Sequence, residues 1–188
     1  AELNELALLN VRQMVQIRLD CLFNELAEDL REEAAAVDQA DSTLLHDRWF
    51  PLLDSHWHIR VIRLADEFGN ELAVTRNEQG YVVGHVSAGS KDGPPILMAY
   101  SPTHPHPIVA GPWLGSEDQD PREKLWFSKA LEDTRNDPIW NLRPQDTSST
   151  PLLQLSYLIR ANKPTAPYRI IQFTVDVNAS AWLDVQRS

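Results

Sequence analysis

Apolar residues recur with a helical period from residue 2 to about residue 37, a stretch that contains no glycine or proline. The positions step by three or four residues and so fall on one stripe of a helix: Leu8, Val11, Val15, Leu19, Leu22, Leu26 and Leu30. A helix of about 36 residues is about 54 Å long, longer than a small domain is wide. We therefore expect one part of it to pack on its own domain and the other on a partner. A second copy of the helix is the simplest partner, and a single helix with a frayed start that crosses its own sheet is the alternative.

The period changes after this helix. A shorter helix is predicted from Asp41 or Ser42, either of which suits an N-cap, to Leu53. Apolar runs at 59–64, 71–76 and 81–87 are separated by the turn-forming segments 66–70 and 77–80, a pattern typical of an antiparallel meander. Residues 88–119 are rich in proline and predict a long loop with one strand at 96–100, and loops of this length are usually functional or mobile.

The second half of the chain mixes one short helix with further strands. An amphipathic helix is predicted from Pro121 to about Asp133, with Trp126 and Phe127 on its inward face. The remaining predictions are an extended piece at 139–142, strands at 152–160 and 168–177, and a closing helical turn at 179–185.

Composition limits the range of functions. The net charge of −10 and the pI near 5.0 argue against a nucleic-acid partner or an anionic membrane surface. No apolar run approaches the ~20 residues that a membrane-spanning helix needs. The single cysteine, Cys21, rules out an internal disulfide and a cysteine-based zinc site, and its place in an apolar helical pattern predicts a buried thiol.

Two histidine pairs raise the possibility of a metal-dependent enzyme. They are His56 with His58 and His104 with His106, and residues at i and i+2 share one face of a strand. Neither pair has a known zinc spacing, so surface histidines are the favoured interpretation and a weak metal site comes second. The chain also lacks a Gly-x-Ser-x-Gly turn and a phosphate-binding glycine loop. An enzyme is the less favoured class, and no cofactor or metal is expected.

Residues 124–176 resemble an extracytoplasmic PAS-like sensor domain of the Cache family. In that family a basic residue, a Trp, a second aromatic residue and an Ala open the helix beside the ligand pocket. The matching residues here are Lys124, Trp126, Phe127 and Ala130, followed by Trp140, Thr150–Ser156 and Val175–Asp176–Val177. Members that bind amino acids carry an arginine where this chain has Lys124, and a tyrosine several residues earlier where residues 116–120 hold no aromatic.

The resemblance implies an α+β fold in which a long N-terminal helix (residues 1–40) packs on a PAS-like antiparallel sheet (residues 41–188). A loop and the short helix would form the pocket. Lys124 or Arg122 would pair with a ligand carboxylate, Trp126 and Trp140 would form an apolar wall, and Asp176 would receive an ammonium. The further candidate ligand contacts are Phe127, Tyr157 and Tyr100.

The function implied is that of the extracytoplasmic, periplasmic ligand-binding part of a bacterial transmembrane receptor, a histidine kinase, diguanylate cyclase or chemoreceptor. Its ligand would be a small carboxylate or an amino-acid-like molecule. We expect a homodimer through the N-terminal helix and membrane helices that flank this fragment in the full protein. Two alternatives remain open: a dimeric scaffold without a small-molecule pocket, and a metal hydrolase that uses the histidine pairs.

Overall fold

The computed structural model describes residues 2–39, 45–86, 96–101, 106–112, 120–142, 152–160 and 167–176. The helical elements are α1 (Glu2–Gln39), α2 (Leu45–Ser55), the 3₁₀ turn η2 (Pro121–Glu123) and α3 (Leu125–Glu132). The strands are β1 (Ile59–Asp66), β2 (Glu71–Asn77), β3 (Gly80–Val86), β4 (Ile96–Tyr100), β5 (Ile108–Pro112), β6 (Ile139–Leu142), β7 (Leu152–Ile159) and β8 (Arg169–Asp176).

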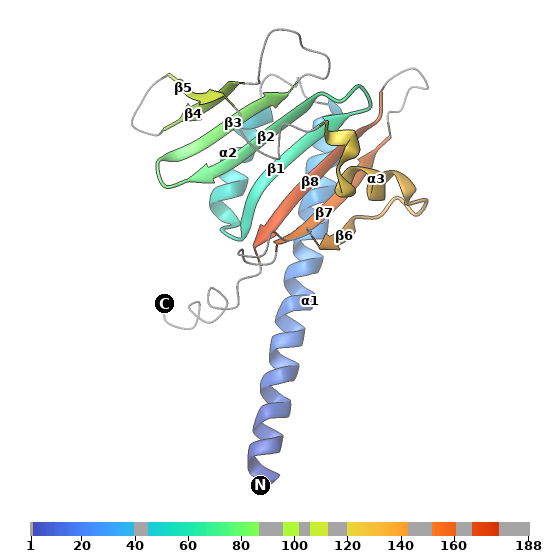
Figure 1. Ribbon diagram of the computed structural model, residues 1–188. Helices are drawn as coiled ribbons and strands as arrows, with labels where there is room; N and C mark the ends of the chain where they lie inside the picture. Colours follow the sequence, from blue (N-terminus) through green and yellow to red (C-terminus); the bar gives the residue numbers. More distant parts are fainter. Residues whose placement is uncertain are drawn as a thin grey trace.

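The eight strands form one antiparallel sheet in the order β5-β4-β3-β2-β1-β8-β7-β6 (Figure 1). The first and last of these strands along the chain, β1 and β8, therefore pair with each other inside the sheet. The β1–β2 turn is closed by the Asp66 carboxylate, which accepts hydrogen bonds from the backbone N–H groups of Phe68 and Asn70 at 2.9 Å each. An aspartate that bonds its own following backbone in this way favours a tight turn.

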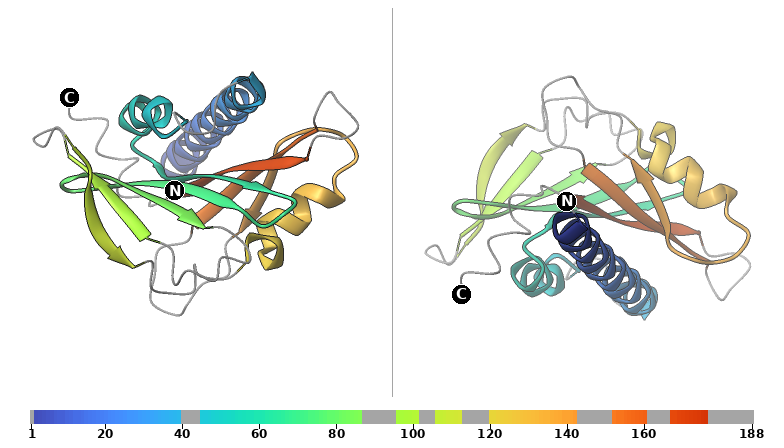
Figure 2. Two further views of the ribbon diagram at one scale, coloured as in Figure 1. Left: turned by 90° about the horizontal axis from the view of Figure 1, so that it is seen from above. Right: turned by 90° about the horizontal axis from the view of Figure 1, so that it is seen from below.

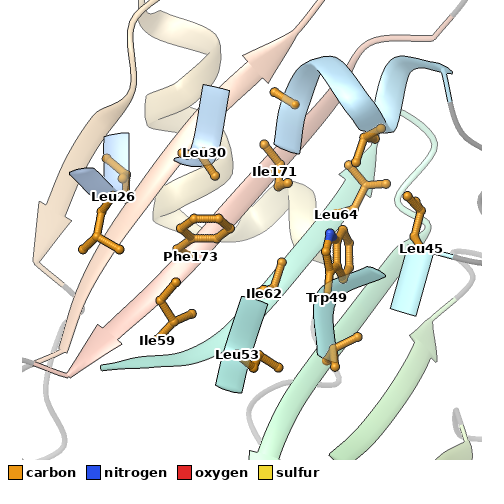
Figure 3. Packing of buried hydrophobic residues seen from close by; sticks show 14 of the residues in the cluster. Leu26, Leu30, Leu45, Trp49, Leu53, Ile59, Ile62, Leu64, Ile171 and Phe173 are labelled. Carbon is orange, nitrogen blue, oxygen red and sulfur yellow. The ribbon is translucent and has the colours of Figure 1, made fainter. Parts of the chain in front are cut away.

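One face of the sheet is covered by α2 and the C-terminal half of α1. Figure 3 shows Leu26 and Leu30 of α1 above Phe173 of β8, and Trp49 of α2 close to Ile62 and Leu64 of β1. Alternate strand residues point to this face because successive side chains of a strand point to opposite sides. The face is almost wholly apolar, so burying it supplies the main hydrophobic core of the domain.

The N-terminal half of α1 extends beyond the sheet (Figure 1). The same apolar stripe that is buried at Leu26 is exposed further back, where Leu8 is 69% exposed and Val11 53%. Cys21 is exposed as well, so the prediction of a buried thiol is wrong. Successive residues of a helix are ~100° apart around its axis, so Cys21 and its neighbour Leu22 point in different directions. Leu22 faces the sheet and is buried, whereas Cys21 faces away from it.

The helix α3 lies on the opposite face of the sheet from α1 and α2 (Figure 2). Its buried side chains are Trp126, Phe127 and Ala130. They pack on one row of side chains across three strands, Ala65 of β1, Ile170 of β8 and Leu158 of β7. The next row of side chains on the same face, Arg63, Gln172 and Ser156, is polar.

The predicted fold class is confirmed: a long N-terminal helix packs on an antiparallel sheet in an α+β domain. Residues 88–119 were predicted as a loop with a single strand at 96–100, which is β4. The structure adds a second strand in this segment, β5. The predicted caps Asp41 and Ser42 and the helical turn at 179–185 lie outside the described residues. Within the described ranges, no helix combines the length and the hydropathy that crossing a membrane requires.

Gly80 is the position at which the fold depends most directly on a glycine. Its φ of +139° is rarely adopted by other residues, and an added Cβ would collide with the carbonyl oxygen of Tyr100 in β4. We expect Gly80→Ala to lower the free energy of unfolding by about 2 kcal/mol or more in chemical denaturation. The neighbouring exposed Gln79→Ala should change it by less than about 0.5 kcal/mol, and equal effects of the two substitutions would contradict this account.

Candidate ligand-binding face

The strand register brings six polar residues together on the α3 side of the sheet. Arg63 of β1 pairs with Gln172 of β8, which pairs with Ser156 of β7. In the next row on the same face, Thr174 of β8 pairs with Gln154 of β7, which pairs with Asn141 of β6. We call these two rows, Arg63–Gln172–Ser156 and Thr174–Gln154–Asn141, the polar rows. They adjoin the apolar row that α3 covers.

The polar rows are buried although they are hydrophilic. Gln172 and Ser156 have no solvent exposure, and only Asn141 of the six is partly exposed. Gln172 donates a 2.8 Å hydrogen bond from Nε2 to Thr174 Oγ1. Three other buried polar atoms, Ser156 Oγ, Gln172 Oε1 and Asn141 Nδ2, have no hydrogen-bond partner among the described residues. Buried polar groups in folded proteins are nearly always hydrogen-bonded, so these atoms call for an explanation.

Two cationic side chains meet one carboxylate beside the polar rows. The Glu71 carboxylate is completely buried and lies 3.4 Å from Arg63 Nη1 and 3.2 Å from Lys124 Nζ. Lys124 directly precedes α3, so this contact joins the start of that helix to β2. The sequence predicted Lys124 as a carboxylate-binding residue but did not single out Arg63. The structure holds both side chains against the Glu71 carboxylate.

The structure places Arg122 differently from Lys124. Its guanidinium is exposed and donates to both carboxylate oxygens of Asp120, the residue that caps η2. This hydrogen bonding holds the pKa of the Asp120 carboxyl below its ordinary value. Arg122 therefore serves the turn before α3 and is not gathered with the polar rows.

Asp176 ends β8 on the side of the sheet that Gln172 and Thr174 share. Its Oδ2 accepts hydrogen bonds from Arg60 at 2.6 Å (Nη2) and 3.1 Å (Nε). Its backbone N–H bonds to the carbonyl of His58 at 2.9 Å. The carboxylate predicted to receive a ligand ammonium thus takes part in an ion pair at the end of the sheet.

Trp126 and Phe127 belong to the core between α3 and the sheet, with 1% exposure each. Phe127 packs near Tyr168 as well as on the apolar row. The indole Nε1 of Trp126 is buried without a hydrogen-bond partner among the described residues. An indole N–H usually finds a partner when it is buried, so Trp126 adds one more donor to the unmatched polar atoms on this face.

The three remaining candidate residues lie on the other face of the sheet. The ring of Tyr100 contacts His46 and Phe50, and the ring of Trp140 meets that of Phe23 of α1 at a tilt. Tyr100, Trp140 and Tyr157 all pack on the core beneath α1 and α2. The third, Tyr157, accepts a 2.9 Å hydrogen bond from Asn136 and lines a cavity of about 390 Å³ beside α1. The sheet therefore separates Tyr100, Trp140 and Tyr157 from Lys124.

The cavity beside Tyr157 is a weaker candidate site than the polar rows. Three of its polar lining residues already have partners, since Tyr157 bonds Asn136, and Arg31 bonds Glu28 and Asp137. None of its side chains appears among the buried atoms without hydrogen bonds.

None of the six residues of the polar rows is among the candidate site residues predicted from the sequence, because each is a single polar residue inside an apolar strand. Such a residue is ordinarily assigned to the solvent side of a sheet. The usable clue is that β8 and β7 read Gln172-x-Thr174 and Gln154-x-Ser156, with polar residues at alternate positions in strands that are otherwise strongly apolar. Only the register shows that these residues meet.

Three members of the two histidine pairs, His56, His58 and His106, lie within the described residues. His58 is buried at the start of β1, where burial, with smaller effects of His56 and Arg76, lowers its pKa to about 4. His106 is exposed, and His104 lies outside the described residues. His56 follows α2 and lies against α1.

Comparison with known proteins places the fold. No protein-family model matches the sequence, and no curated protein matches it. The ligand-binding domain of the Campylobacter jejuni chemoreceptor Tlp3, solved with 4-methylisoleucine, matches with a TM-score of 0.52 and 10% identity, over 87% of this chain and 55% of that one. A domain of a putative sensory box/GGDEF protein from Vibrio parahaemolyticus matches with a TM-score of 0.44 and 14% identity, over 91% and 57%.

The chain spans little more than half the length of the two solved domains that it matches. At 10% identity, the likeness to the chemoreceptor domain concerns the fold. It agrees with the PAS-like α+β fold that the sequence predicts, so that prediction is confirmed. What this chain binds has to be argued from its own residues.

Ser156 offers a direct test of whether the unmatched polar atoms are real. Removing a buried hydroxyl that has no partner should leave stability unchanged or raise it by about 1 kcal/mol, so we expect Ser156→Ala to unfold at the same or a higher denaturant concentration. Thr174→Val is the matched control, because it removes a buried hydroxyl that does accept a hydrogen bond, and it should cost about 1 kcal/mol or more. A clear loss of stability in Ser156→Ala would show that its hydroxyl is already bonded.

Proposed function

We propose that this chain is the ligand-binding domain of an extracytoplasmic bacterial receptor and that it binds a small carboxylate or an amino-acid-like molecule on the polar rows. The domain itself would not be an enzyme. In the full protein it would be flanked by membrane helices and would control a histidine kinase, a diguanylate cyclase or a chemoreceptor signalling domain. The observation that carries the proposal is the set of buried polar atoms that have no hydrogen-bond partner among the described residues.

The energetics favour a ligand on this face. A buried donor or acceptor that lacks a partner costs about 1–3 kcal/mol, and a ligand that supplies the missing bond recovers that amount. A fold that keeps Ser156 Oγ, Gln172 Oε1 and Asn141 Nδ2 in this state is therefore less stable than it would be with apolar residues there. Functional sites commonly show such a sacrifice of stability.

The donor and acceptor types indicate the class of ligand. Arg63 presents a planar guanidinium with N–H donors, and Lys124 adds a second cation close by, so a carboxylate is the complementary group. Gln172 Oε1 is an acceptor and suits an ammonium or hydroxyl of the same ligand. An amino acid carries both kinds of group. The ligand of the Campylobacter chemoreceptor domain, 4-methylisoleucine, is of this type.

A thermal-shift screen against amino acids and short carboxylates tests the proposal. A ligand at about 100 times its dissociation constant should stabilise the domain by ~2.7 kcal/mol. For any hit, we expect Ser156→Ala and Lys124→Ala each to reduce the shift measured against its own unliganded protein, with at least a tenfold weaker affinity by calorimetry. Ser55→Ala, at the end of α2 on the other face, should keep the full shift.

Two results would contradict the proposed function. A hit that is unaffected by both Ser156→Ala and Lys124→Ala would place the ligand elsewhere on the domain. A flat screen across amino acids, carboxylates and amines would favour the alternative of a dimeric scaffold without a small-molecule site.

We further propose that the domain forms a homodimer through the exposed half of α1. Leu8, Val11 and Val15 continue the stripe that is buried at Leu22 and Leu26, yet all three are at least half exposed. A second copy of α1 would bury this stripe by the side-chain packing typical of paired helices. A conformational change caused by a ligand near β8 and β1 would then be transmitted to α1, because α1 packs on β7 and β8.

Val11→Glu tests the dimer. It places a charge on the exposed stripe, so we expect at least a tenfold rise in the dimer dissociation constant by analytical ultracentrifugation, with little change in monomer stability. Gln13→Glu adds the same charge on the other side of α1 and should leave association unchanged. A wild-type chain that stays monomeric at high micromolar concentration, or equal effects of the two variants, would contradict this interface.

A further inference from the structure

A second group of polar side chains lies at the junction between α1 and the start of β1, on the opposite face from the polar rows. Glu25 and Asp29 are one turn apart on α1 and so share a face of the helix. His56 lies between the end of α2 and β1 and approaches them from the other side. One ligand-type atom from each of these three residues lies within 4.8 Å of the other two.

The contact between His56 and Asp29 has an unusual geometry for an ion pair. His56 Nε2 lies 3.2 Å from Asp29 Oδ2. That oxygen is nevertheless buried without a hydrogen bond among the described residues, so the two atoms are close but are not aligned as donor and acceptor. Two ligands of a tetrahedral zinc ion, each about 2.1 Å from the metal, are separated by about 3.4 Å and point toward the metal instead of each other.

A fourth side chain lies next to His56. His58 is 7% exposed, and its Nε2 has no hydrogen-bond partner among the described residues. Its ring meets the ring of His56 edge to face, with the centroids 5.5 Å apart. A buried imidazole nitrogen without a partner is unusual, and here it belongs to the residue whose ring packs on His56.

We propose that Glu25, Asp29 and His56 bind one divalent transition-metal ion, for which Zn²⁺ is the model ion. One imidazole nitrogen and two carboxylate oxygens suit Zn²⁺, with water in the remaining position. The exposed Glu25 side chain already places one carboxylate oxygen within 4.8 Å of the ligand atoms of the other two residues. Two carboxylates and a neutral imidazole carry two negative charges, which a divalent cation balances.

The position of this site gives it a role in signalling, which rests on the function proposed above. Among the α1 side chains that the structure describes, Leu22 is the first buried one, so Glu25 and Asp29 lie near the start of the part of the helix that packs on the sheet. The carbonyl of His58 accepts the backbone hydrogen bond from Asp176 at the end of β8. A metal ion bound here would tie α1 to the start of β1 (Figure 1). It would thereby hold the projecting helix in one orientation relative to the strands that carry the polar rows.

Isothermal titration of the purified chain with Zn²⁺ tests the site. We expect one ion per chain, and at least a tenfold loss of affinity in His56→Ala, Asp29→Asn and Glu25→Gln. Glu25 is exposed, so Glu25→Gln remains informative if the other two variants fold poorly. The control variants are His106→Ala and Glu123→Gln, which remove an exposed histidine and an exposed carboxylate distant in sequence from both α1 and His56, and they should bind Zn²⁺ as the wild type does.

The outcomes separate this site from the ligand-binding face. Ser156→Ala should bind Zn²⁺ normally, so a failure of the organic ligand screen leaves the metal result interpretable. No Zn²⁺ binding in the wild type would overturn the proposal. Binding that survives Glu25→Gln and His56→Ala, or that falls equally in the two controls, would mean an adventitious ion only and would overturn it as well.

Discussion

The central strands β1 and β8 are buried on both faces, and this constraint shapes the rest of the domain. On one face they meet α1 and α2 mainly through apolar side chains, with one hydrogen bond from Arg169 of β8 to the carbonyl of Val37 in α1. On the other face, α3 covers only the apolar row. The neighbouring residues Arg63, Gln172 and Ser156 are buried and polar, and burial makes every missing hydrogen bond costly.

The two faces of the sheet have different roles. The apolar face binds the C-terminal half of α1 and so fixes the direction in which the exposed half projects (Figure 1). The polar face holds the groups suited to a small ligand. Because β8 contributes Phe173 to one face and Gln172 to the other, a ligand on the polar rows is separated from α1 by the thickness of a single strand.

Hydrophobic periodicity predicted the described helices and strands apart from β5, since most of these elements have apolar patterns bounded by turn residues. It also placed Trp126 inward and Lys124 at the start of α3. The site was harder to predict because its members come from β1, β6, β7 and β8, and only the register of these strands brings them together. Tyr100, Trp140 and Tyr157 show the converse: their residue types suit a pocket, but strand alternation turns them toward α1 and α2.

The central claim is that the polar rows complete their hydrogen bonds with a ligand. A crystal structure of the domain with the best carboxylate or amino-acid hit tests it most directly. The account predicts ligand density on the α3 side of the sheet, within hydrogen-bond distance of Ser156 Oγ and Gln172 Oε1 and with a carboxylate facing Arg63 or Lys124. Ligand density elsewhere, or side chains of the chain itself bonded to Ser156 and Gln172, would contradict it.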